Sequence, residues 1–187
     1  MKHQPDYLFI THLHPDHAYF IEKELVDITI PVFAPERFEK IKKLHVISDK
    51  VKVSGFEVIP VPVIHSKYVK SFAYIIEKKH RRILYTGDMV WIEKKHHHKF
   101  GELDLVITDG SFIQKKGMVR RDDEGNIYGH QGIPQLVNLF KKFTRYIIFT
   151  HFGNWFYHDI PSAREKIRAL DEGMQLEAAY DGMETEI

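Results

Sequence analysis

Short apolar runs alternate with polar stretches along the chain, and their lengths predict a protein rich in β-strands. The first run, 7–10, is too short for a helix and ends at a polar loop, as a buried strand does. The runs at 83–86, 103–108 and 146–150 are continuously apolar, which is typical of strands covered on both faces. Strands are predicted at 7–10, 32–33, 56–64, 72–77, 83–86, 103–108, 146–150 and 176–180.

Other segments place apolar residues at the spacing of an amphipathic helix. These segments are 17–26, 36–44, 89–99, 132–142 and 161–171, the last of which opens at Pro161. Strands alternating with helices predict an α/β sandwich, with sheets inside and helices outside. The sequence shows no internal repeat and no linker composition, so the 187 residues are expected to form one domain, 1–187.

The composition narrows the range of partners and ligands. Lys and Arg number 27 against 26 Asp and Glu, so the chain lacks the basic field typical of nucleic-acid-binding proteins. The absence of cysteine leaves His, Asp and Glu as the side chains that can bind a metal ion. No apolar run has the length of a membrane span, and the N-terminus has no signal-peptide core. We therefore expect a cytoplasmic protein with no membrane partner.

The first polar loop concentrates groups that bind divalent metal ions. It carries His12, His14, Asp16 and His17 within six residues, between a predicted strand and a predicted helix. Neutral imidazole and carboxylate are the usual protein ligands of divalent transition metals. The chain reverses direction at such a loop, so these side chains can converge on one site.

Three further polar residues stand at the ends of predicted strands. His65 follows the run 56–64, Asp88 follows Gly87 after the run 83–86, and His151 follows the run 146–150. Each has an ordinary structural explanation when it is taken alone. Side chains at strand ends can meet at one rim of an α/β fold, however, and together with the first loop they supply enough ligands for two ions.

Taken in order, these motifs resemble the metallo-β-lactamase superfamily of dinuclear metallohydrolases over residues 6–155. The resemblance implies an αββα sandwich and a metal-activated water that attacks a carbonyl carbon or a phosphorus atom. By the same resemblance, His12, His14 and His65 bind one ion, Asp16, His17 and His151 bind the second, and Asp88 bridges both. Zinc is the ion that we expect, with iron, manganese and cobalt as alternatives.

Within the superfamily, the sequence is similar to the branch of transfer-RNA 3′-processing endonucleases and small cyclic-phosphate phosphodiesterases. That similarity implies that His130 stabilises the phosphate or protonates the leaving oxygen, although His130 also fits a helix N-cap or loop residue. Asp16 is expected to orient the attacking water, and Asp109 is a candidate to orient a ligand. An Arg-Tyr pair and a long basic insertion of the RNA-processing members are missing, so a small phosphodiester is favoured over structured RNA.

Two other functions remain open from the sequence. The same metal centre suits a lactonase or a thioesterase-type hydrolase, and a catalytically inert metal-binding scaffold is the third possibility. Eleven residues precede His12, whereas members of the superfamily normally place several strands there. We expect a fold that lacks those first strands, through truncation or a short gene start. A homodimer in which another protomer completes the sheet, and a reduced variant, are the alternatives.

Two remaining clusters are interpreted as structural. Consecutive helical residues point about 100° apart, so His96, His97 and His98 cannot all face one ion and are expected to form a solvent-facing run. The aromatic residues Trp155, Phe156 and Tyr157 follow a strand. We expect them in the core, and the alternative is a pocket in which they stack on a base.

Overall fold

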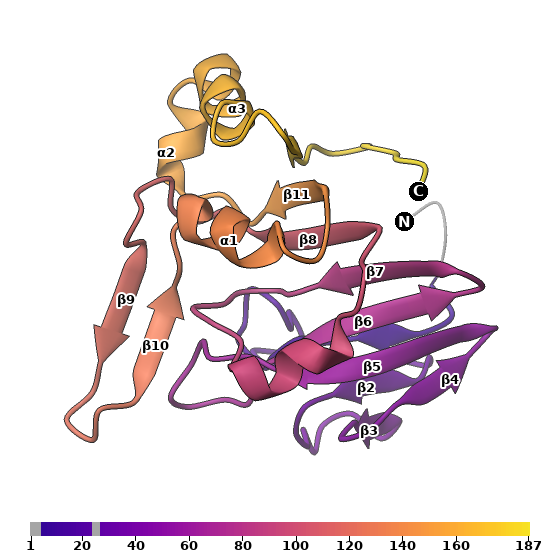
Figure 1. Ribbon diagram of the computed structural model, residues 1–187. Coiled ribbons are helices and arrows are strands. Elements are labelled where there is room, and N and C mark those ends of the chain that lie inside the picture. The colour runs from indigo at the N-terminus through magenta and orange to yellow at the C-terminus, as the bar shows by residue number, and fades with distance from the viewer. Residues whose placement is uncertain (1–4, 24–26) are drawn as a thin grey trace.

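The computed structural model describes residues 5–23 and 27–187, which form two packed sheets and a separate two-stranded sheet, with helices on one side (Figure 1). The strands are β1 (Leu8–Phe9), β2 (Val32–Ala34), β3 (Leu44–Val46), β4 (Val51–Val53), β5 (Phe56–Pro62), β6 (Phe72–Lys78), β7 (Arg81–Tyr85), β8 (Leu105–Asp109), β9 (Met118–Arg121), β10 (Ile127–His130), β11 (Tyr146–Thr150) and β12 (Gln175–Ala178). The helices are the 3₁₀-helix η1 (Lys94–Lys99), α1 (Ile133–Phe140), α2 (Asn154–Tyr157) and α3 (Ile160–Arg168). None of the helices in these described ranges is long and apolar enough to cross a membrane.

The larger sheet is mixed, with strand order β12-β11-β8-β7-β6-β5-β4. Strands β7, β8, β11 and β12 are parallel, while β4 to β7 pair antiparallel. Two antiparallel steps separate β5 from β7, so β5 runs in the same direction as β7, β8 and β11. The carboxyl ends of these four strands therefore meet at one edge of the sheet.

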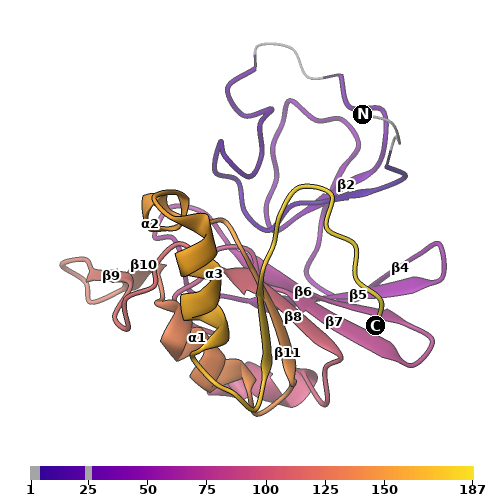
Figure 2. The same cartoon turned by 90° about the horizontal axis from the view of Figure 1, so that it is seen from above.

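Helices α1 and α3 cover one face of the larger sheet (Figure 2). Leu136 and Phe140 of α1 are buried against Leu84 and Phe149 of the strands, within the largest apolar cluster of the protein. Burial of these apolar side chains, from the helix and from the sheet, is the main source of stability for the larger sheet and its helices.

The smaller sheet, β1-β2-β3, is parallel and lies on the other side of the larger sheet (Figure 2). Phe9 of β1 packs edge-on against Tyr74 of β6, with ring centres 5.7 Å apart. The Tyr74 hydroxyl is buried and donates a hydrogen bond of 2.7 Å to the carbonyl of Ile10. This contact fixes the chain just before the loop 12–17 onto the larger sheet.

The expected α/β sandwich is confirmed, but several predicted helices are wrong. Residues 17–23 form turns, residues 36–43 form bends and turns, and 24–26 of the first predicted helix lie outside the described residues. The apolar side chains of Phe20 and Ile41 reach the small core from these turns, which reproduce helical spacing without a continuous helix. The predicted helix 89–99 is reduced to η1, whereas 132–142 and 161–171 correspond to α1 and α3.

The predicted strands match strands of the structure, and four strands were not predicted. These are β3, β4, β9 and β10, whose sequences are short or polar. Strands β9 and β10 form a hairpin that projects from the body of the molecule (Figure 1). Their pairing satisfies backbone groups of a charged segment that has no apolar pattern.

Candidate metal centre

The predicted site residues lie where the carboxyl ends of the strands meet. His65 follows β5, Asp88 follows β7, Asp109 ends β8 and His151 follows β11. The loop after β1 reaches the same edge because the amide of Phe72 donates a hydrogen bond to the carbonyl preceding His12. The parallel topology therefore gathers side chains that are far apart in the sequence.

The first group of candidate ligands contains His12, His14 and His65, whose nearest ring nitrogens all lie within 4.8 Å of one another. His65 Nδ1 lies 2.9 Å from the carbonyl oxygen of Gly129. That oxygen can only accept a hydrogen bond, so Nδ1 carries the proton and Nε2 keeps its lone pair. His12 Nδ1 lies 3.1 Å from the Thr11 hydroxyl, which can donate or accept and therefore positions the ring without fixing its tautomer. The His65 ring is thus oriented with Nε2 available to an ion.

The second group contains Asp16, His17, Asp88 and His151, again with ligand atoms within 4.8 Å of one another. Asp88 Oδ2 lies 3.2 Å from His17 Nε2 in this group and 3.9 Å from His65 Nε2 in the first group. The Asp88 carboxylate is 3% exposed and therefore faces both groups from the interior. This is the position that a bridging ligand requires.

Buried atoms in this cluster have lone pairs that the protein does not satisfy. Within the described residues, His12 Nε2, His17 Nε2 and Asp88 Oδ1 are buried and make no well-aligned hydrogen bond, although His17 Nε2 lies 3.2 Å from Asp88 Oδ2 and Asp88 Oδ1 lies 3.2 Å from His151 Nδ1. Such groups are costly to bury unless something else binds them. Burial, assisted by the neighbouring imidazoles, lowers the pKa of His12 to about 2, so its ring is neutral. Neutral imidazoles beside carboxylates fit a divalent transition metal.

A third group of side chains connects the candidate ligands to His130, at the end of β10, through Asp109. His130 Nδ1 lies 2.7 Å from Asp109 Oδ2, and the Asp109 side chain is fully buried. Burial alone would lower the pKa of His130, but the hydrogen bond and the charge of Asp109 outweigh it and raise that pKa. The same bond holds the pKa of Asp109 below its usual range, although burial opposes this shift. The pair is therefore a carboxylate hydrogen-bonded to a histidine whose pKa is raised.

Ser111 links this pair to His151. The Ser111 hydroxyl lies 2.5 Å from Asp109 Oδ1, 2.9 Å from His151 Nδ1 and 3.3 Å from His130 Nδ1. Asp109, against the effect of burial, raises the pKa of His151 to about 9. Binding of an ion at His151 near neutral pH must therefore displace a proton.

Two backbone conformations set the position of the central ligands. His151 has φ +55°, a left-handed conformation that is uncommon outside glycine and is often found at functional sites. Gly87, just before Asp88, has φ +59°, and a Cβ atom there would lie 2.8 Å from the side chain of Thr11. Glycine at this position thus permits close approach of the loop that carries the first ligands.

The cluster opens to solvent on the side of the second group. The side chain of Asp16 is 61% exposed and that of His151 is 38% exposed, whereas His12 is fully buried. A substrate would therefore reach the centre past Asp16 and His151.

All eight predicted site residues, including His130, come together at the edge of the larger sheet where the strands end. Asp109 also lies here, as expected of a residue that orients others. The contacts of Ser111 and Ser66 with the site were not predicted, and the Ser66 hydroxyl lies 3.3 Å from His14 Nε2. Ser66 directly follows His65 in a site motif, whereas Ser111 stands in no motif and the sequence carries no signal for its contact.

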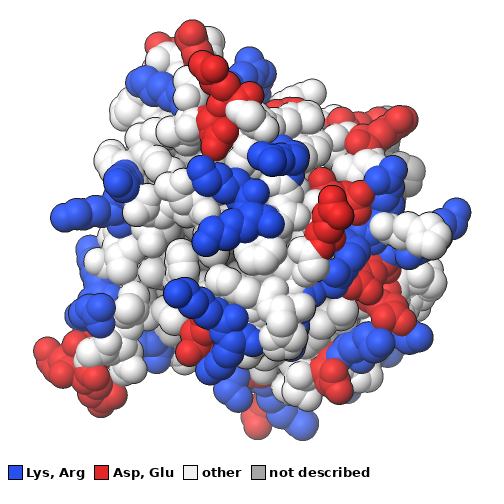
Figure 3. Space-filling model, in the orientation of Figure 1, with Lys and Arg blue, Asp and Glu red and all other residues white. Residues whose placement is uncertain are grey.

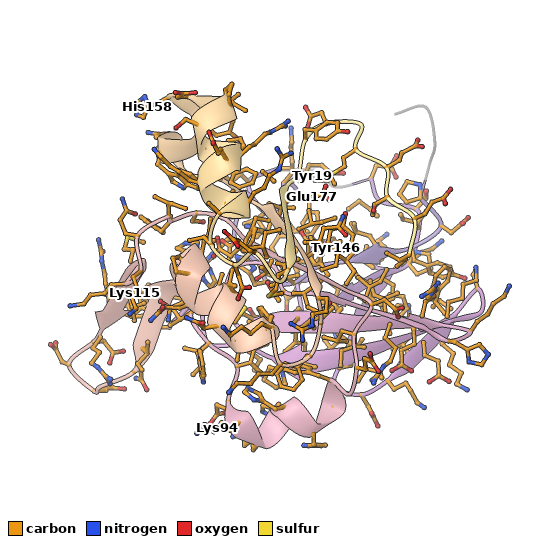
Figure 4. All side chains as sticks on the ribbon, turned by 45° about the horizontal axis from the view of Figure 1, so that its top comes forward. Tyr19, Lys94, Lys115, Tyr146, His158 and Glu177 are labelled. Carbon is orange, nitrogen blue, oxygen red and sulfur yellow. The ribbon has the colours of Figure 1, made fainter. Side chains whose placement is uncertain are left out.

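The histidine triplet and His158 lie elsewhere. Figure 4 shows Lys94 of η1 and His158, at the end of α2, on opposite sides of the molecule. The histidine triplet belongs to η1, and its solvent-facing prediction holds for the exposed His98 but not for His96, whose side chain is 18% exposed, or for His97. That ring stacks on Phe100, is half-buried, and its Nε2 lies 2.9 Å from the carbonyl of Ile92. The prediction of an aromatic core after β11 holds for Phe156, which is buried, but not for Tyr157, which is 62% exposed.

Two packed sheets with an imidazole and carboxylate cluster at one edge define a hydrolase fold of the metallo-β-lactamase class. A family model described as "Beta-lactamase superfamily domain" matches residues 2–152, and the chain belongs to this superfamily. A comparison with curated proteins found no match.

Comparison with solved structures gives the same fold at low sequence identity. A diphosphatase from the PhnP family is 23% identical with a TM-score of 0.67, and the match covers 97% of this chain and 71% of that one. The metallo-β-lactamase fold protein YhfI from Bacillus subtilis is 17% identical with a TM-score of 0.71, covering 95% and 76%. The short form of human tRNase Z is 17% identical with a TM-score of 0.56, covering 95% and 77%. These similarities show the fold, and the activity must be argued from the site.

Proposed function

We propose that the protein is a metal-dependent phosphodiesterase that hydrolyses a small phosphodiester. The observation that carries this proposal is the buried Asp109–His130 pair, 2.7 Å apart, beside the carboxylate of Asp88. A phosphodiester releases an alkoxide that must gain a proton, and a histidine with a raised pKa can donate one.

The residues present fit two divalent cations, of which zinc is our first choice. His12, His14 and His65 would hold one, Asp16, His17 and His151 the other, and Asp88 would bridge them. When bound, such ions favour deprotonation of water and offset negative charge on the phosphate oxygens. The unsatisfied atoms of His12, His17 and Asp88 support this assignment.

The protein side chains supply orientation and proton transfer. Asp16 is exposed at the mouth of the centre, where its carboxylate can accept a hydrogen bond from the attacking water. That water gives up a proton to the Asp16 carboxylate and forms the new bond to phosphorus as the bond to the leaving oxygen breaks. His130 donates its Nε2 proton to that oxygen, because Nδ1 is held by Asp109. The products are a phosphate monoester and an alcohol.

A small substrate is favoured by the charge distribution. Basic and acidic side chains are interspersed over the face shown in Figure 3, and the net charge of the chain is +1. A protein that binds a long polyanion normally presents a continuous basic surface. The similarity to a structure described as a diphosphatase adds support for phosphate chemistry over carbon-ester chemistry.

A substrate panel tests this proposal against its alternatives. The zinc-loaded protein is assayed on bis-p-nitrophenyl phosphate, a 2′,3′-cyclic nucleotide, an acyl lactone and a thioester. We expect turnover of the phosphodiesters, and turnover of the carbon esters alone would favour a lactonase or thioesterase. Failure of all four substrates at full metal occupancy would favour an inert metal-binding scaffold.

A matched pair of histidine variants tests the proton donor within the same panel. His130→Ala should lower kcat on the phosphodiester about 100-fold and leave the metal content unchanged. His158→Ala removes an exposed histidine beside α2 and should leave both unchanged. If His130→Ala keeps the kcat of His158→Ala, His130 is not the proton donor.

A further inference from the structure

A pocket of about 430 Å³ opens beside the metal centre, on its exposed side. His151 belongs to both the pocket and the second ligand group, so the two are continuous. The other walls come from α2, α3 and the chain that follows β12, and Figure 2 shows α3 running beside that chain. A group attached to a phosphate at the centre can therefore extend into this pocket.

Aromatic rings form much of the pocket wall. Tyr157 is 62% exposed and Tyr180 is 56% exposed, and both line the cavity. Behind them Phe152 and Phe156 stack with ring centres 3.9 Å apart, which makes a rigid floor. Large exposed aromatic side chains around a cavity favour a planar aromatic ligand, because it can stack on them.

Arg164 brings an unsatisfied donor to the same pocket. In the described parts of the chain its Nε atom is buried and has no hydrogen-bond partner. Its guanidinium lies 5.2 Å from the centre of the Tyr180 ring, which orients it along the pocket wall. A buried donor of this kind favours a ligand that offers an acceptor atom.

Asp181 adds an acidic residue to the pocket. It lines the cavity together with Arg164, so a carboxylate and a guanidinium both belong to its wall. A second phosphate group, which carries only acceptors and a negative charge, would be repelled by Asp181. A heterocycle with both acceptors and donors on its edge matches one guanidinium and one carboxylate.

We propose that this pocket binds the nucleobase of a nucleotide phosphodiester. The base stacks on Tyr157 and Tyr180 and turns its polar edge toward Arg164 and Asp181. The volume of the pocket falls in the usual range for small-ligand sites, about 300–1,000 Å³. This inference rests on the proposed function, because it assumes that the scissile phosphate is at the metal centre.

Two substrates that differ by the base alone test the inference. A 2′,3′-cyclic nucleotide and ribose 2′,3′-cyclic phosphate share the ring that is opened. Wild-type kcat/KM should be about tenfold or more higher for the nucleotide, since stacking of one base contributes about that much. Ribose 5-phosphate 2,3-cyclic phosphate, which carries a second phosphate and no base, should gain no such advantage.

Variants of the pocket residues test whether the preference for the nucleotide over the ribose phosphate arises in this pocket. Tyr180→Ala and Arg164→Ala should each lower kcat/KM for the nucleotide about tenfold and leave that for the ribose phosphate unchanged. Tyr180→Phe keeps the ring and should keep the preference. Arg168→Ala, on an exposed position of the same helix, is the matched control and should behave as the wild type.

Binding of a nucleoside 5′-monophosphate by calorimetry separates this inference from the proposed function. Binding that is weakened about tenfold by Tyr180→Ala supports the pocket even where no phosphodiester is hydrolysed, and the proposed function alone then fails. Equal kcat/KM for the two cyclic substrates would contradict base binding in this pocket. So would a preference for the nucleotide that both alanine variants retain. In either case the proposed phosphodiesterase activity is unaffected. A preference for the second phosphate over the base would contradict base binding as well.

Discussion

At the scale of single residues, the contact between Asp109 and His130 determines how the centre can use a proton. Asp109 is buried, and its charge raises the pKa of His130. A protonated His130 is present at pH values below that pKa and disappears as the pH rises through it. If His130 acts as the acid, kcat must therefore fall as the pH rises through the pKa of His130.

Asp109→Asn keeps the shape of the side chain and removes its charge. The pKa of His130 should then fall, so the alkaline loss of kcat should begin at a lower pH, with kcat at neutral pH about tenfold lower. Asp171→Asn, which alters a surface ion pair with Lys141, is the control. The pH dependence of kcat is measured on the folded variants, and an alkaline limb that does not move would contradict this role.

The sequence predicted these residues unequally. His12, His14, Asp16 and His17 are close together in one loop, and their spacing alone indicates a metal site. Ser111 contacts Asp109, His130 and His151 through its hydroxyl. Serine is common at strand ends, so this contact depends on the fold and could not be read from the chain.

At the scale of elements, the sequence predicts where the main strands end, but the helices that it predicts over 17–23 and 36–43 do not form. Continuous apolar runs identify β7, β8 and β11, and each is followed by a site residue. The segments 17–23 and 36–43 have helical spacing but pack on each other, as Phe20 does on Phe38, and share a small core with Val32 of β2. Tertiary packing thus overrides a local pattern in segments this short.

The turn between β7 and Asp88 offers a test at this scale. Gly87→Ala should destabilise the protein by about 2–4 kcal/mol, because it adds left-handed strain and a contact with Thr11. Gly125→Ala is the matched control, since Gly125 also has a positive φ but its Cβ would meet no atom within 4 Å of those described. It should cost about 1–2 kcal/mol. Urea unfolding measures both, and equal losses would show that the Thr11 contact is unimportant.

At the scale of the whole molecule, the metal centre depends on both sheets. The loop after β1 supplies His12 and His14, while the larger sheet supplies His65, Asp88 and His151. The sheets are joined near this loop by the hydrogen bond from Tyr74 to Ile10. We therefore expect residues 1–187 to unfold as one domain, with loss of metal binding in the same transition.

Tyr74→Phe removes this bond and keeps the ring. Because the Ile10 carbonyl then loses its partner, the free energy of unfolding should fall by about 1–2 kcal/mol and affinity for zinc should fall with it. Tyr146→Phe removes an exposed hydroxyl contact with Thr185 and should have little effect. Thermal unfolding and zinc titration measure both, and unchanged zinc affinity in a destabilised Tyr74→Phe protein would show that the sheets position the ligands independently.

The central claim is a centre for two ions that share Asp88. Elemental analysis of the zinc-loaded protein tests it most directly, with Asp123→Ala as a control at the exposed tip of the β9–β10 hairpin. The wild type and Asp123→Ala should each hold two ions per chain, and folded Asp88→Ala should hold one or none. Two ions in Asp88→Ala, or none in the folded wild type, would contradict the claim.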